Sequence, residues 1–217
     1  MERNRKVQVI AIVALIVGVI GLSIDFASFS NVLNIQSSAN VKPDNSTMNV
    51  IFSSAESKAE VTEITPVVTP NSLVATNGII DNSNDPTISN LSATFTEPGQ
   101  TAVYKFYAYN AGELNAFLKS IVFENVTGQN ATKVCTASAG TSNELVQKAC
   151  EKISVKVKVG NELETSTGKA SITGHTLAKG NGEVVVVTLE YEAGADRADG
   201  DFNVAFGNIT LNYSSAD

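Results

Sequence analysis

Alternating apolar and polar residues recur through most of the chain and predict β-strands. The pattern is clearest in ISVKVKV at 153–159, where the apolar positions would face a core and the lysines would face water. Similar runs lie at 29–35, 48–54, 88–96, 103–109, 114–126, 182–192 and 201–215. Their number predicts an all-β protein, an antiparallel β-sandwich of jelly-roll type.

Turn residues connect the central runs. Glu97-Pro98-Gly99-Gln100 predicts a tight turn, because proline fixes φ and glycine allows a positive φ. Asn110-Ala111-Gly112-Glu113 predicts the next reversal. With one strand at 88–96 and others at 103–109 and 114–126, these turns predict an antiparallel meander.

A single short helix is expected in SNELVQKACEKI, with Ser142 or Asn143 as its N-cap and an apolar face at helical spacing. It would lie over the end of the sandwich. Cys135 and Cys150 bracket this region, and in an exported domain such a pair predicts one local disulfide. Two buried free thiols are the alternative.

The first 27 residues differ from all that follows. Arg3, Arg5 and Lys6 precede an uncharged apolar run at 9–24, which as a helix would reach roughly 24 Å, short of the ~30 Å hydrocarbon core of a membrane. This is typical of a signal peptide or a membrane anchor. Residues 28–217 are then expected to form one extracytoplasmic domain, which is either secreted or anchored to the cell membrane. Within this domain, the Pro/Thr-rich loop at 54–73 is either a linker or an ordered surface excursion.

Charge and composition argue against several functions. The net charge is −7 and no basic cluster follows Lys6, so a nucleic-acid partner is not expected. The only histidine, His175, has no partner residue in its own segment and is expected on the surface, so we expect no catalytic site and no metal site. The acidic cluster ADRADGDF fits a solvated hairpin turn, and no cofactor is expected.

One stretch resembles a known group of exported proteins. EPGQTAVYKFYAYNAGELNAFLKSI has a Pro-Gly turn, a strand, an Asn-x-Gly turn and a second strand, with a weaker echo in HTLAKGNGEVVVVTLEYEAG. Together with the basic start, the apolar run and the strand that follows it, this is similar to the TasA/camelysin group of biofilm-matrix proteins. The resemblance implies a jelly-roll domain exported by a signal peptide. Fibre-forming members of that group polymerise by donating an N-terminal strand to a neighbour.

Three functions fit these features. The first is a structural surface or matrix protein that self-assembles into fibres through a donor strand carrying Phe29, Leu33 and Ile35 on one face. The second is a monomeric extracellular binding module held in the membrane by residues 9–24. The third is a pilin-like subunit, because pilins also begin with a basic stretch and an apolar helix. None of the three is an enzyme.

Overall fold

A computed structural model describes residues 30–35, 48–59, 61–83, 86–160, 163–165, 168–169 and 171–215. The apolar run at 9–24 and Phe29 therefore lie outside the described residues. Within the described ranges no helix has the length and apolar character needed to span a membrane.

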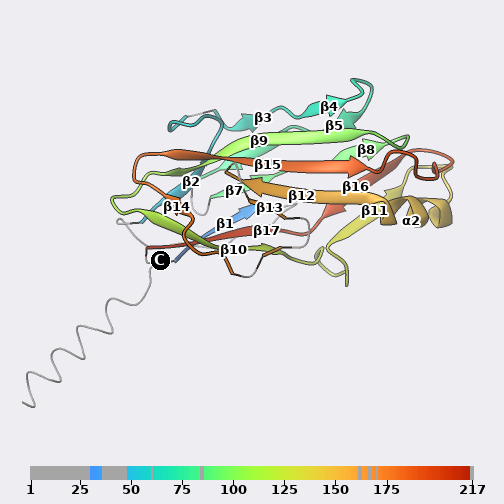
Figure 1. The fold of residues 1–217 in the computed structure, drawn as a ribbon. Helices are drawn as coiled ribbons and strands as arrows, with labels where there is room; N and C mark the ends of the chain where they lie inside the picture. The colour runs from blue at the N-terminus through green and yellow to red at the C-terminus, as the bar shows by residue number, and fades with distance from the viewer. Residues whose placement is uncertain are drawn as a thin grey trace, which may run out of the picture.

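The described chain is mostly β-strand, arranged in three sheets with one helix, α2 (Asn143–Glu151) (Figure 1). Sheet A has the order β14 (Thr176–Leu177), β10 (Ala116–Phe123), β17 (Ile209–Ser214), β1 (Ser30–Ile35), β7 (Thr87–Ser89), β6 (Gly78–Asp81), β3 (Glu63–Ile64). Sheet B has the order β13 (Leu163–Thr165), β12 (Ile153–Val159), β15 (Gly182–Tyr191), β9 (Thr101–Asn110), β2 (Val50–Ser53), and β4 (Val67–Thr69) also pairs with β9. Sheet C has the order β11 (Lys133–Ala137), β16 (Phe202–Phe206), β8 (Ala93–Phe95), β5 (Val74–Ala75). The predicted β-rich class is confirmed for these residues, and their strand pairing is antiparallel except between β1 and β7.

Sheet B forms one layer, and sheets A and C face it from the other side. The ring of Tyr191 in sheet B lies 6.1 Å from Phe95 and 5.6 Å from Phe202, both in sheet C. Sheets A and B are joined by a hydrogen bond from the buried Tyr213 to Glu183. The core between the layers comes from alternate residues of each long strand, as the burial of Ile153, Val155, Val157 and Val159 in β12 shows.

The predicted meander is wrong, although both of its turns exist. Residues 88–96 form two strands rather than one, because Asn90 adopts φ 63° and the chain passes there from sheet A to sheet C. The turn at Pro98 and Gly99, with Gly99 at φ 88°, leads from β8 in sheet C to β9 in sheet B. The turn after Asn110 leads from β9 to β10 in sheet A. Each turn therefore changes layers instead of closing a hairpin.

The helix and the disulfide are confirmed. Helix α2 begins after its N-cap Ser142, whose hydroxyl accepts a hydrogen bond from the Leu145 N–H. Cys135 in β11 and Cys150 in α2 are joined, with their Cα atoms 5.8 Å apart. The disulfide fastens the helix to sheet C at one end of the molecule (Figure 1).

The Pro/Thr-rich loop at 54–73 is an ordered excursion with short strands. Its strand β3 lies in sheet A and its strand β4 in sheet B, and the chain continues into β5 of sheet C. It thus runs back and forth across one side of the molecule. Ile64 and Leu73 are buried there and fill the space between the layers.

Candidate assembly site

Strand β1 lies inside sheet A, between the last strand of the chain and a strand from its first half. It pairs antiparallel with β17 through six residue pairs, from Ser30 opposite Ser214 to Ile35 opposite Ile209. On its other side it pairs parallel with β7 through only two, Asn34 opposite Thr87 and Ile35 opposite Ile88. The predicted strand at 29–35 is therefore present from residue 30, and its backbone completes the sheet of its own chain.

The two halves of sheet A are connected through β1 alone. On one side lie β14, β10 and β17, and on the other lie β7, β6 and β3. No pairing among the described strands joins β17 directly to β7. Removal of β1 would leave two facing strand edges with unpaired backbone N–H and C=O groups, which is an arrangement that accepts an added strand.

Most of the residues that face β1 across these seams are buried, and along β17 apolar residues alternate with polar ones. Leu33 is opposite Leu211, and Ile35 is opposite both Ile209 and Ile88. The side chains of Leu211, Ile209 and Ile88 are fully buried. Sequence alternation predicted the strand containing Ile209 and Leu211 but not its pairing with β1. Alternation shows which face of a strand is apolar, whereas the partner depends on the path of the whole chain.

The acceptor strand β17 is held firmly on its other side. It pairs with β10, and side chains reinforce this seam: Asn212 Nδ2 donates to Ser120 Oγ at 2.7 Å, and Thr210 Oγ1 donates to Glu124 Oε1 at 3.2 Å. The seam between β17 and β10 thus carries side-chain hydrogen bonds in addition to its backbone ladder.

A buried polar group also fastens β17 to sheet B. The Tyr213 hydroxyl donates to Glu183 Oε1 at 2.6 Å, and Nε2 of His175 lies 2.5 Å from the other oxygen of the same carboxylate. Burial raises the pKa of Tyr213 well above its usual value, and the adjacent Glu183 charge acts in the same direction. His175, expected as a loop or strand-end residue on the surface, directly precedes β14 and is partly exposed, but the fold also brings Glu183 of β15 to it, a partner that lies outside its own segment.

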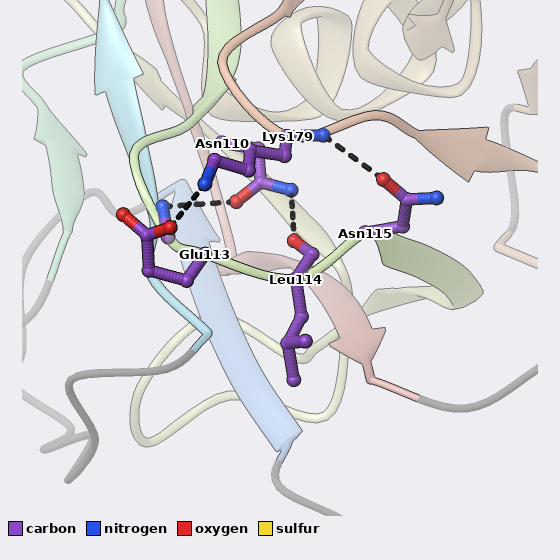
Figure 2. Close-up of polar contacts among 6 residues, drawn as sticks. Asn110, Glu113, Leu114, Asn115 and Lys179 are labelled. Carbon is purple, nitrogen blue, oxygen red and sulfur yellow. Dashed lines mark hydrogen bonds and ion pairs between the residues drawn. The ribbon is translucent and has the colours of Figure 1, made fainter.

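The Asn110 turn, shown in Figure 2, leads into β10 near the end of sheet A at which β1 begins. Asn110 is fully buried, and its Nδ2 donates to the carbonyl oxygens of Leu114 at 2.8 Å and Leu177 at 3.1 Å. Its Oδ1 accepts from the Gly112 N–H at 3.1 Å. The Lys179 N–H donates to Asn115 Oδ1 at 3.1 Å, as Figure 2 also shows. The predicted turn motif is therefore a junction between the β9–β10 and β14–β15 connections.

The other predicted turn motif, with Pro98 and Gly99, lies away from β1. The buried Gln100 accepts hydrogen bonds from the Thr96 and Glu97 N–H groups at 2.7 and 3.1 Å, which fixes the turn. The disulfide lies at the same end of the molecule as this turn, beside sheet C (Figure 1). The structure therefore does not bring the turn motif, the disulfide and the candidate donor strand into one site.

The candidate site consists of the backbone pairing of β1 with β17 and β7. In the described ranges no group of three or more His, Cys, Asp or Glu residues is arranged to hold a metal ion. Compared with known proteins, the chain matches no family model, and no curated protein shows significant similarity to it.

Proposed function

We propose that this chain is an exported structural subunit of the cell surface or biofilm matrix, and that copies assemble into fibres by exchanging β1. In this proposal the domain is a jelly-roll sandwich, and β1 of one copy enters the seam between β17 and β7 of the next. The observation that supports it is that, among the strands the structure describes, only β1 connects the two halves of sheet A. The resemblance to the TasA/camelysin group points the same way.

The length of chain after β1 allows such an exchange. About 14 residues separate Ile35 from Val50, and a chain of that length spans at most roughly 46–50 Å when extended. That reach is sufficient for β1 to enter the sheet of an adjacent domain. Exchange of identical strands replaces every pairing that it breaks, so its cost in free energy is low.

A monomeric membrane-anchored binding module is the second candidate. It is favoured by the fact that β1 completes the sheet of its own chain. The two functions differ in one physical property. In a monomeric module, a paired β1 and β17 belong to the same chain, whereas in an exchanged assembly they belong to two different chains.

A cysteine pair across this seam distinguishes them. Val32 is opposite Asn212, so full-length protein with Val32→Cys and Asn212→Cys can be oxidised mildly after assembly and run on a denaturing, non-reducing gel. Strand exchange predicts covalent multimers. A single-chain β1 predicts cross-linked monomers only, and that result would contradict the proposal.

The matched control places the second cysteine on the other neighbour of β17. Ser120 is opposite Asn212 in the β10–β17 ladder, and their side chains are hydrogen-bonded. Ser120→Cys with Asn212→Cys should give intrachain disulfides under either function. Multimers in this control would show that the oxidation joins chains non-specifically.

A further inference from the structure

The side of the molecule covered by residues 61–79, here called the edge segment, differs from the rest of the surface. The edge segment supplies an outermost strand to each of the three sheets: β3 to sheet A, β4 to sheet B and β5 to sheet C. In Figure 1 these strands lie together along one long side of the fold. An edge strand has backbone groups or side chains that no neighbouring strand covers, so another protein chain can bind there.

Exposed apolar side chains are concentrated in the edge segment. Val61, Val67 and Val74 are 59%, 68% and 67% exposed, and Ile79 is 43% exposed. The three other large apolar side chains that are exposed in the described residues are spread over β10, α2 and the β9–β10 turn. Val67 and Val74 flank a single turn, in which the Leu73 N–H donates to the Pro70 carbonyl oxygen at 3.0 Å.

The edge segment is also almost free of charge. Glu63 is its only charged residue, and the Glu63 carboxylate accepts a hydrogen bond from Asn77 Nδ2 at 2.8 Å. The chain as a whole carries a net charge of −7, so two copies repel each other over most of their surfaces. The repulsion between two copies is smallest at this neutral apolar strip. A basic partner of another kind would instead be attracted to the acidic surfaces outside the strip.

We propose that the edge segment is a face through which copies of this chain contact one another side by side. Pro66 and Pro70 bracket β4 and lack backbone N–H donors, which opposes extension of its ladder by an added strand. The contact is therefore made by side chains. A few valines bury far less than the roughly 1,200 Å² of a stable interface, so one contact is weak and many contacts between arrayed copies act together.

Single cysteines in the full-length chain test this face, because both native cysteines are joined in the disulfide. Val67→Cys and Val74→Cys are compared with Leu145→Cys, an exposed apolar position on α2. Each variant is oxidised mildly at millimolar concentration, and the initial rate of covalent dimer formation is measured. The edge variants should dimerise about tenfold faster than the helix variant or more. Equal rates would overturn the proposal.

A charge placed on the edge gives the second test. In the Val74→Cys chain, Val67→Glu should lower the dimerisation rate to that of Leu145→Cys, because two carboxylates would then meet at the contact and add to the repulsion between two acidic chains. An unchanged rate would overturn the proposal. Melting temperatures close to that of the unmodified chain would show that all variants are folded, as expected for exposed positions. One cysteine per chain yields dimers only, so this result is distinct from the multimers that strand exchange predicts, and either proposal can fail alone.

Discussion

Sheets A and B differ in how their central strands are held. In sheet B, β15 pairs with β9 through nine residue pairs and with β12 through seven. In sheet A, the central β1 pairs with β7 through two. Sheet B is a continuous scaffold built from strands between Val50 and Tyr191, whereas sheet A depends on a strand from the N-terminal side. The comparison shows that the centre of sheet B is paired at length on both sides, whereas the centre of sheet A has one long seam and one short seam.

The largest expected effect comes from a charge on β1. Leu33→Asp places a carboxylate opposite the buried Leu211, and we expect complete loss of assembly, measured by sedimentation and electron microscopy. Val32→Asp is the matched control, because position 32 is opposite the half-buried Asn212 and should retain assembly. Assembly that is normal in Leu33→Asp would contradict a role for β1.

A cavity in sheet B should instead weaken the scaffold. Phe106 is fully buried and its ring lies 5.4 Å from that of Phe52, so Phe106→Ala should lower the free energy of unfolding by about 3–5 kcal/mol. Tyr107→Ala, on the opposite face of the same strand, should cost about 1 kcal/mol or less. Denaturant unfolding measures both values. Equal losses would mean that sheet B is not packed as described.

Removal of the disulfide should have a slightly smaller effect, at the end away from β1. Cys135 and Cys150 are 15 residues apart, and closure of a loop of that length contributes about 3 kcal/mol in the chain-entropy model. Cys135→Ala with Cys150→Ala should lower stability by that order without changing assembly of the folded protein. Labelling of both thiols in denatured, non-reduced wild-type protein would show that the disulfide does not form.

The smallest expected effect concerns the bond between the two layers. Tyr213→Phe removes the hydrogen bond to Glu183 and should cost about 1–3 kcal/mol at neutral pH. The raised pKa of Tyr213 means that the folded state keeps this proton more tightly than the unfolded state does. Its contribution is therefore fully present below about pH 10 and is lost as the pH rises further.

Unfolding measured across that pH range checks the sign. The wild-type protein should lose stability above about pH 10 more steeply than Tyr213→Phe does, so the difference between the two should shrink. Tyr104, whose pKa is also raised by burial, contributes to the alkaline loss in both proteins and cancels in the comparison. Parallel pH profiles would mean that Tyr213 is not buried beside Glu183.

Local sequence signals predicted the parts of this fold but not their connections. Alternation located β1, β9, β12 and β15, and the Ser142 cap and the cysteine pair located α2 and the disulfide. These features depend on residues close together in sequence. The strands of two or three residues in the edge segment are too short to show a period, so they were not predicted.

The predictions that failed or were incomplete concern places where residues distant in sequence decide the structure. Residues 88–96 alternate as one strand does, yet Asn90 turns the chain between sheets, and the Tyr104 hydroxyl donates to the carbonyls of Thr76 and Ser92 at 2.9 and 2.8 Å beside that point. His175 likewise meets a carboxylate in β15 that its own segment does not contain. In the candidate site, the strand β1 was predicted whereas its pairing with β17 and β7 was not, for the same reason.

Pairing of β1 with β17 joins the beginning of the described domain to its end. A chain that leaves the ribosome or crosses a membrane from its N-terminus presents β1 first and β17 last. Until β17 has emerged, β1 lacks the strand with which it forms its longer seam. Sheet B can already form by then, because its strands lie within residues 50–191. In the proposed assembly, the order in which the chain emerges would give a finished neighbour the first opportunity to capture β1, and the timing of synthesis would decide between a closed monomer and a growing polymer.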